Sequence, residues 1–213
     1  IFGRIVKEDF DMKLILWKLQ SLDDMRLCEH VTLLEIRVAY EFLSNSAGGI
    51  DGYSIESMGK LIDIHGYWFE RLFNNWIENG IPDVVKISRL VPIPKSTGGS
   101  RPIVVTKVIL RLFESVVLRR LLPLVESRIS DSQRGFKKNS SCYENICCLL
   151  NVIAECKEGN RILYILFIDF QKAFDSVEIN TLLIKLGKFG IVGKSLGLIR
   201  DLLSGRKYQV DND

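Results

Sequence analysis

The longest fully apolar run in the chain lies between Arg161 and Asp169 and has seven members, residues 162–168. It has isoleucine at every third position and aromatic rings at Tyr164 and Phe167. This length and β-branched content predict a strand that is buried on both faces. Asp169 follows at the end of this strand, where a carboxylate is costly unless a cation or hydrogen-bond donors compensate its charge.

The rest of the pattern predicts a helix-rich chain with a small sheet. Apolar residues recur at helical spacing in residues 9–45 (as two helices), 54–80, 106–123, 141–157, 175–190 and 195–203. Residues 86–94 alternate like a strand and form a predicted hairpin with a returning strand at 101–105, and a further short strand is predicted at 207–210. Ser54 is a predicted N-cap, while Ser141 and Asp175 each precede a glutamate at capping-box spacing.

Histidine and cysteine show no zinc pattern. His65 falls on the apolar stripe of the 54–80 helix, so we expect a core histidine rather than a ligand. The five cysteines include no C-x-x-C pair, and we expect reduced intracellular thiols. Four of them, at positions 142, 147, 148 and 156, are expected to be small buried hydrophobes on one helix face.

Length and hydropathy limit the class of protein. The 213 residues suit one large domain or two small ones, and 47% hydrophobic residues suffice for a core. The seven-residue run is far shorter than the ~20 residues of a membrane helix, so we expect no membrane span. The chain begins at Ile1 without a basic and then apolar leader, which favours the interior of a longer chain.

The net charge of +3 is unevenly distributed. Residues 86–138 hold twelve Lys and Arg against three Asp and Glu, an excess of +9. Such a segment favours a polyanion partner, because neutralised phosphates are the sequence-independent source of nucleic-acid affinity. A solvated basic surface with no partner explains the charge equally well.

The two aspartates that flank Phe170 and Phe174 have competing explanations. Asp169 is a candidate metal ligand, but a carboxylate at a strand end can also simply reach solvent. Asp175 is a weaker ligand candidate, because a helix cap accounts for it. Two-metal nucleotidyl transfer needs more than one carboxylate, and the chain supplies one convincing ligand.

Two basic turns are further candidates. Lys95 and Arg101 flank a glycine-rich hairpin tip, which could bring both cations onto a triphosphate, although such turns are common. The turn at 133–136 joins hydrogen-bond donors to the ring of Phe136, which suits stacking and backbone contact with a template strand. An ordinary packed loop is the alternative for this second turn.

Three motifs in order carry a resemblance to a known family. They are Lys95-(loop)-Arg101-Pro102, then Gln133-x-Gly135-Phe136, then Phe167-x-Asp169-x-x-Lys172-Ala173-Phe174-Asp175. In this order they resemble the reverse transcriptase domain of non-LTR (LINE-type) retrotransposons and, more distantly, group II intron reverse transcriptases. The resemblance extends from about Gly48 to the end of the chain. It implies an α+β fold, a partial right-hand polymerase of fingers and incomplete palm, helix-rich with a small mostly antiparallel sheet.

The resemblance also implies roles for residues. Asp169 would be the first catalytic, metal-binding aspartate, with the Phe170 carbonyl as a possible backbone ligand of one of two Mg²⁺ or Mn²⁺ ions. Phe174 would exclude a ribose 2′-OH, and the implied nucleotide-binding residues are Lys95, Arg101, Lys172, Ala173 and Phe174. The implied nucleic-acid-binding residues are Gln133, Arg134, Gly135, Phe136, Lys137 and Lys138. The implied partners are an RNA template, a DNA primer strand and a dNTP.

The sequence departs from the family in three places. Gly48-Gly49-Ile50-Asp51-Gly52 lacks the usual proline, and Arg134 replaces an aromatic or apolar residue. The family's Tyr-Ala-Asp-Asp turn, which supplies the remaining metal ligands, and its thumb are expected after Asp213. We therefore divide the chain into a helical N-terminal extension (1–47), fingers with the start of the palm (48–160) and an incomplete palm (161–213).

Two functions compete on the sequence alone. The first is part of an RNA-directed DNA polymerase, intracellular, nuclear and cytoplasmic, whose palm and thumb continue in a parent polyprotein and whose isolated 213 residues are inactive. The second is a catalytically dead nucleic-acid-binding remnant of such an element.

Overall fold

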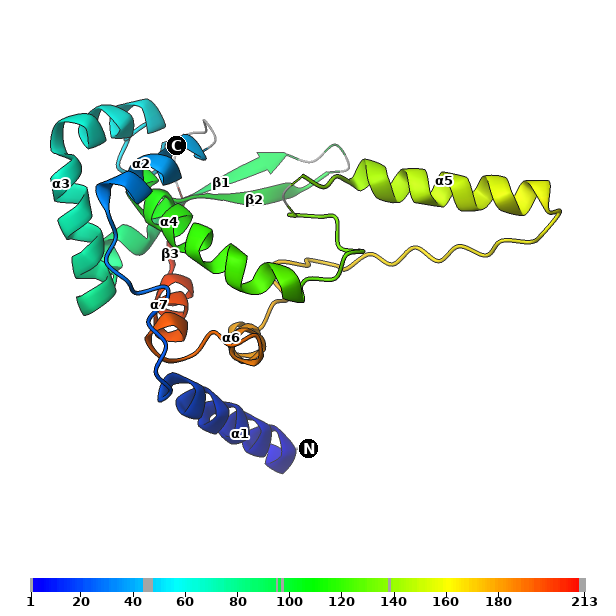
Figure 1. The fold of residues 1–213 in the computed structure, drawn as a ribbon, viewed down its shortest axis with the longest axis horizontal. Helices are drawn as coiled ribbons and strands as arrows, with labels where there is room; N and C mark the ends of the chain where they lie inside the picture. The colour runs from blue at the N-terminus through cyan, green and yellow to red at the C-terminus, as the bar shows by residue number, and fades with distance from the viewer. Residues whose placement is uncertain (1, 44–47, 95, 97, 138, 211–213) are drawn as a thin grey trace. The chain divides into compact units, whose positions relative to one another are not determined.

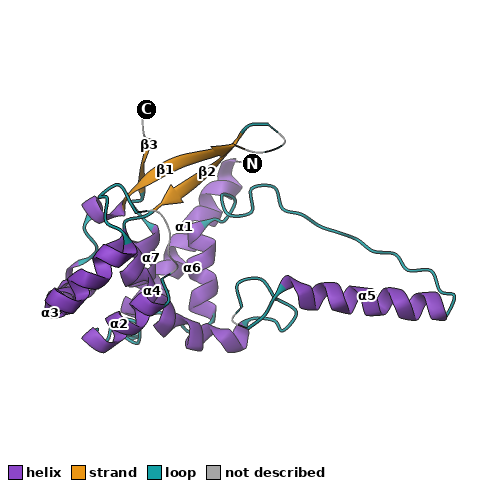
Figure 2. Ribbon diagram, turned by 90° about the horizontal axis from the view of Figure 1, so that it is seen from above, coloured by secondary structure: helices purple, strands orange, loops and turns teal. Residues whose placement is uncertain are grey.

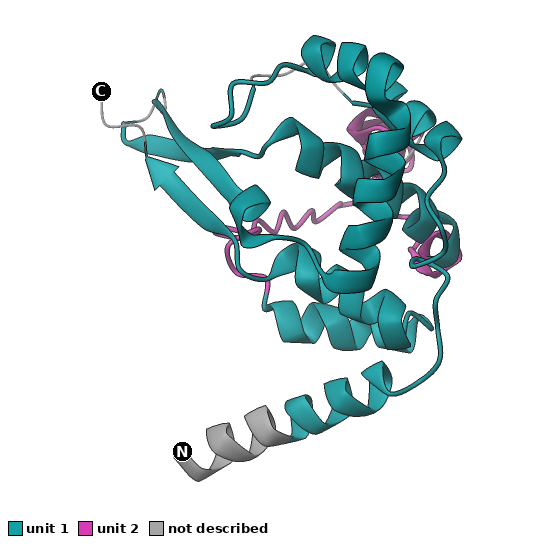
Figure 3. Cartoon of the chain, turned by 90° about the vertical axis from the view of Figure 1, so that its left-hand side faces the viewer, with its two compact units in different colours: residues 1–124, 178–213 teal, residues 125–177 magenta. Residues whose placement is uncertain are grey.

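The computed structural model describes residues 2–43, 48–94, 96, 98–137 and 139–210. The chain forms two compact units, which we call unit 1 (residues 1–124 and 178–213) and unit 2 (residues 125–177). Figure 1 shows the order of the elements, and Figure 3 colours the two units.

Unit 1 contains the described strands and most of the helices. Its elements are α1 (Phe2–Gln20), α2 (Leu33–Glu41), α3 (Ile55–Asn79), η1 (Asp83–Lys86), β1 (Ile87–Pro94), β2 (Ser100–Val105), α4 (Val108–Val125, its last residue in unit 2), α6 (Ile179–Lys188), α7 (Gly193–Leu203) and β3 (Lys207–Val210). Unit 2 contains η2 (Glu126–Arg128) and α5 (Cys142–Glu158).

The sheet has the order β2-β1-β3. β1 pairs antiparallel with β2, with Ile93 opposite Arg101, and parallel with β3, with Ile87 opposite Lys207. The predicted helix-rich α+β fold with a small, mostly antiparallel sheet is confirmed, and the parallel β1–β3 pair makes the sheet mixed. The division into extension, fingers and palm remains a prediction, since the two units follow spatial contacts rather than function.

The core of unit 1 includes an aromatic cluster whose rings come from α3 and α4. The rings of Phe73 and Phe113 are fully buried, with their centroids 5.0 Å apart, and Trp76 meets Phe113 edge to face at 5.3 Å. α3 begins where the Ser54 side chain accepts a hydrogen bond from Ser57 N, which confirms the predicted cap. It ends at Gly80, whose φ of 91° is a conformation that favours glycine.

The predicted buried strand at 162–168 is wrong. Figure 2 draws the chain there as a loop, and Tyr164 and Ile168 are 89% and 74% exposed. A strand requires a neighbour to receive its backbone hydrogen bonds, and none of the described strands pairs with this segment. Apolar, β-branched composition gives the tendency to form a strand but does not supply the partner.

Two expectations about burial are also wrong. Helix α5 forms as predicted but has no buried residues, so its cysteines, free and exposed or half-exposed, are not core side chains.

His65 is exposed and has non-helical backbone angles (φ −124°, ψ 28°), which kink α3. The kink turns His65 away from the core stripe, and it lines an apolar cavity of about 340 Å³ with Trp68 and Ile109.

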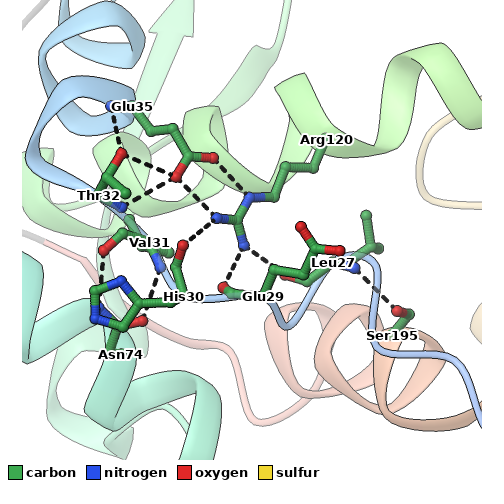
Figure 4. A network of polar contacts seen from close by, with 9 residues as sticks. All are labelled: Leu27, Glu29, His30, Val31, Thr32, Glu35, Asn74, Arg120 and Ser195. Carbon is green, nitrogen blue, oxygen red and sulfur yellow. Dashed lines mark hydrogen bonds and ion pairs between the residues drawn. The ribbon is translucent and has the colours of Figure 1, made fainter.

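Arg120 of α4 connects three segments of unit 1 (Figure 4). Its side chain is 13% exposed and pairs with both oxygens of Glu35, Nε to Oε1 and Nη2 to Oε2 each at 2.9 Å. Its two terminal nitrogens also donate to the carbonyls of Leu27, Glu29 and His30. Burial raises the pKa of Glu35, but the hydrogen bonds from Arg120 and from the Thr32 capping box outweigh it, so the net pKa is lowered.

Asp24 holds the loop after α1 against the start of α7. Its side chain, 5% exposed, accepts hydrogen bonds from Arg26 Nε at 2.8 Å and from Val192 N at 3.1 Å. The Asp24 carbonyl accepts from Ser195 N, and the Ser195 hydroxyl accepts from Leu27 N. The hydrogen bond from Arg26 is the main reason that the pKa of Asp24 is lowered from 3.8 to about 2.

Replacement of Arg120 by alanine is expected to lower the free energy of unfolding by about 2–4 kcal/mol, because the Glu35 carboxylate and three carbonyls lose their donor. Urea denaturation of the Arg120→Ala variant measures this. Arg119→Ala is the matched control, since the neighbouring guanidinium lies over the Phe42 ring at 4.3 Å and contributes about 0.5–1 kcal/mol. Equal losses in the two variants would contradict the role of Arg120.

Asp24→Asn is expected to cost about 2 kcal/mol at pH 7 and less in acid. Because the folded pKa lies below the unfolded value, the charged Asp24 stabilises the fold above about pH 4, and this stability is lost as the pH falls toward 2. Urea unfolding at pH 7 and pH 3 should therefore show a smaller deficit at pH 3. Asp23→Asn, at the exposed neighbouring position, is the control, and a pH-independent deficit would rule out the charged form as the cause.

Candidate nucleotide and nucleic-acid site

Asp169 lies in the open segment of unit 2 and its side chain is exposed. Mg²⁺ and Mn²⁺ require several oxygen ligands at one point. Within the described parts of the chain, no group of three or more His, Cys, Asp or Glu side chains could hold a metal ion. Asp169 and the Phe170 carbonyl alone do not make such a site, and no metal-dependent step follows from the described residues.

A tight turn follows Asp169. Lys172 has a φ of 50°, and its carbonyl accepts a hydrogen bond from Ser176 N at 3.0 Å. The Ser176 hydroxyl also donates to the Ala173 carbonyl at 3.0 Å. This turn takes the place of the first helical turn that the sequence predicted at Asp175.

The predicted cap at Asp175 is wrong. Helix α6 begins at Ile179, and its N-cap is Glu178, whose carboxylate accepts hydrogen bonds from Asn180 N and Thr181 N. Hydrogen bonding from Thr181, first from its side chain and then from its backbone amide, is the main reason that the pKa of Glu178 is lowered. Glu178 caps α6 three residues after Asp175, so the helix starts later than predicted.

The structure brings two predicted site residues of unit 2 together. The rings of Phe136 and Phe174 meet edge to face, with their centroids 6.1 Å apart and their planes at 86°. Both rings remain exposed, at 93% and 80%. The Gln133 side chain donates to the Gly135 carbonyl at 3.1 Å, and Phe136 has a φ of 60°. The predicted template turn and the predicted sugar-excluding ring therefore share one aromatic contact.

Two cations in or next to the turn at 133–136, Arg134 and Lys137, form ion pairs with acidic residues of unit 2. Arg134 Nη1 lies 2.9 Å from Glu144 Oε2, and Lys137 Nζ lies 3.1 Å from Asp131 Oδ1. The predicted capping box at Ser141 does not form: the Glu144 carboxylate pairs with Arg134, and the Glu144 amide donates to the Ser141 carbonyl rather than to its hydroxyl. The positive charge of these residues is partly neutralised within the chain.

The hairpin forms in unit 1 as predicted. Arg101 is exposed in β2, opposite Ile93 near the tip. Lys95 and Lys138 lie outside the described residues, so their predicted contacts remain predictions. Arg101 belongs to unit 1, whereas Asp169, Lys172, Ala173 and Phe174 belong to unit 2.

Sequence reasoning missed one buried cation. Lys86 counted among the basic residues of 86–138, but it is only 4% exposed and its Nζ lies 2.5 Å from Asp201 Oδ1. The sequence held one local sign of burial at Lys86. This residue follows an apolar Val-Val pair and directly precedes the alternating strand. Its partner is 115 residues away in the sequence, which a local pattern cannot indicate.

Comparison with known proteins agrees with the predicted resemblance. A family model described as reverse transcriptase (RNA-dependent DNA polymerase) matches residues 93–213, more than half of the chain. These residues include Arg101, the turn at 133–136 and the segment from Asp169 to Phe174. The chain belongs to the reverse transcriptase family, and the predicted resemblance to the domain of non-LTR retrotransposons is confirmed.

Within that family, similar proteins are retrovirus-related Pol polyproteins of R2 retrotransposable elements. The type-1 element protein of Bradysia coprophila is 30% identical over 183 residues, 83% of this chain and 20% of the relative. That of Nasonia vitripennis is 30% identical over 151 residues, covering 67% and 14%. The type-2 element R2DM protein of Drosophila melanogaster is 25% identical over 198 residues, covering 88% and 18%. The chain thus spans about a fifth or less of the length of these relatives.

Among the residues that the structure describes, no helix is long and apolar enough to cross a membrane.

Proposed function

We propose that this chain is part of an RNA-directed DNA polymerase that copies retrotransposon RNA into DNA. The observation that carries the proposal is the family match over residues 93–213, which covers the catalytic motif around Asp169. The RNA template, the DNA primer strand and the dNTP are the partners that this function requires. The proposed place of action is inside the cell, in the nucleus and the cytoplasm.

The proposed chemistry is two-metal nucleotidyl transfer, with Mg²⁺ or Mn²⁺. Asp169 and the Phe170 carbonyl are our candidates for part of the ligand set. The other carboxylates would come from the Tyr-Ala-Asp-Asp turn that the family resemblance places after Asp213. Residues 1–213 alone are therefore proposed to be inactive in primer extension, because one carboxylate cannot hold two ions.

The open segment 162–168 is proposed to become a strand in the full-length protein. Its side chains are apolar and exposed, and its backbone has no strand neighbour among the described residues. An apolar strand with free backbone groups readily pairs with a further strand. Pairing would fix Asp169 at the end of a buried strand, as the sequence pattern favours.

A catalytically dead, nucleic-acid-binding remnant is the second candidate function. The described residues hold no cluster of metal-ligating side chains, which agrees with a remnant and equally with a polymerase whose other ligands follow Asp213. The sequence that follows Asp213 separates the two candidates. A reading frame that continues to Tyr-x-Asp-Asp supports the polymerase, whereas a stop or frameshift before it supports the remnant.

Primer extension by the full-length protein on an RNA template tests the polymerase and its residue roles. Asp169→Asn is expected to reduce incorporation at least about 100-fold, because the residue would no longer supply a charged metal ligand. Phe174→Val is expected to leave dNTP incorporation largely intact and to admit ribonucleotides, since it removes the ring that would meet a 2′-OH. Phe136→Val, which removes the contacting ring, is the control for a general effect of losing the aromatic pair. An unchanged dNTP to rNTP ratio in Phe174→Val would refute the sugar-excluding role.

We further propose that residues 86–138 contribute sequence-independent nucleic-acid binding through phosphates. Affinity for an RNA/DNA duplex should then fall with the logarithm of salt concentration, by about 0.7–0.9 per phosphate contact. Because Lys86 and Arg120 are buried in ion pairs, the slope should correspond to fewer contacts than the twelve cations of the segment.

The Asp131→Asn variant tests the contribution of Lys137 to binding. It releases Lys137 from its ion pair and removes a negative charge. It should tighten binding to the duplex and steepen the salt dependence by about one contact. Glu78→Gln, at an exposed acid of α3 in unit 1, is the control for a change in net charge alone. Equal effects of the two substitutions would refute the local role of Lys137, and a flat salt response would refute phosphate binding.

A further inference from the structure

A buried ion pair attaches the start of the β1–β2 hairpin to α7 of unit 1. Lys86 is the last residue of η1, immediately before β1, and its side chain is buried. Its ammonium group contacts Asp201 Oδ1, while Asp201 Oδ2 accepts a hydrogen bond from Ile81 N at 2.8 Å. The Asp201 carboxylate of α7 therefore binds both the residue that follows the end of α3 and the residue that precedes β1.

Two other contacts hold the same base. Lys107, between β2 and α4, donates to the Val84 carbonyl of η1 at 2.8 Å. Arg206, immediately before β3, contacts Glu114 of α4 and donates to the Leu202 carbonyl at 2.7 Å. The segments that enter β1, leave β2 and enter β3 are thus each attached to a neighbouring element.

The Lys86–Asp201 pair lies directly at the base of β1, where it can set the direction of the strand. β1 is paired with β2 only from Arg89 onward, so Ile87 and Ser88 have β3 as their sole described strand neighbour. The strand from Ile87 to Ile93, opposite Arg101, is about 20 Å long, so a tilt of about 5° at its base moves Arg101 by roughly 2 Å. A small change at Lys86 is therefore amplified at the hairpin tip.

We propose that Lys86 and Asp201 are positioning residues for the incoming nucleotide: their ion pair sets the direction of the β1–β2 hairpin and so the place of Arg101. This inference rests on the proposed function, because it takes Arg101 as a contact to the triphosphate. Lys86 itself touches no substrate in this role and acts through Arg101.

The test measures single-nucleotide incorporation by the full-length protein, with KM and kcat for the dNTP determined separately. Lys86→Met keeps an unbranched side chain of similar length and removes the charge. It should raise the KM for dNTP about tenfold and change kcat by less than about threefold, because the chemistry at the reacting atoms is untouched. Asp201→Asn, which can retain the hydrogen bond from Ile81 N, should change KM in the same direction and serves as the second variant.

A double-mutant cycle distinguishes positioning from a loss of stability. In an Arg101→Ala background, Lys86→Met should raise KM by less than about twofold, since the group it positions is gone. Arg120→Ala is the control, because it destabilises unit 1 away from the hairpin and should leave KM for dNTP unchanged.

Each outcome separates the inference from the proposed function. An equal rise of KM in both backgrounds, an unchanged KM in Lys86→Met, or the same rise in Arg120→Ala would overturn the positioning role while the polymerase assignment stands. A wild-type protein that extends no primer would overturn the proposed function and the positioning role with it. Variants of Lys86 and Asp201 that both fail to fold would show that the pair maintains the fold, which also overturns the inference.

Discussion

A β-strand is stable only when its backbone N–H and C=O groups pair with a neighbouring strand, and this requirement governs the part of the chain that carries Asp169. Residues 162–168 have the composition of a buried strand, yet their side chains are exposed and no described strand lies beside them. Asp169, the turn at Lys172 and the Phe174 ring follow directly from this segment. Under the proposed function, their final arrangement depends on the pairing of 162–168 with a strand of the full-length protein.

Unit 1 satisfies the same requirement internally. Its strands pair with one another, and its loops are held by buried charges that also bind backbone groups. Arg120 donates to three carbonyls besides Glu35, and Asp24 accepts from two backbone amides. Asp201 joins Lys86 to the Ile81 amide. In each case one side chain connects segments that are distant in sequence, so the fold of unit 1 depends on a few long-range polar contacts as well as on its aromatic core.

The sequence allowed good prediction wherever local interactions decide the structure. The hairpin and the α3 helix, with its Ser54 cap and Gly80 end, depend on neighbours in the chain or on the apolar pattern. The motif order also identified the family without any structural information. These features are encoded in spacing, which a single sequence displays directly.

Prediction failed where two local solutions compete or where a distant partner decides. The capping-box spacing predicted a cap at Asp175, but the partner glutamate of that box, Glu178, is itself the N-cap of α6. His65 had the spacing of a core residue, but a kink turned it outward. Lys86 looked like one more surface cation because its partner, Asp201, lies far along the chain. For 162–168 the pattern gave the strand tendency, while the state of the segment depends on a neighbour that the pattern cannot identify.

Hydrogen–deuterium exchange of the backbone amides of 162–168 tests this account most directly, with residues 1–213 compared to the full-length protein. The amides of β1, which is paired on both sides, provide an internal reference for slow exchange. The account predicts near-unprotected exchange of 162–168 in residues 1–213 and protection comparable to β1 in the full-length protein. Rapid exchange of 162–168 in the full-length protein would contradict the claim that a paired strand presents Asp169.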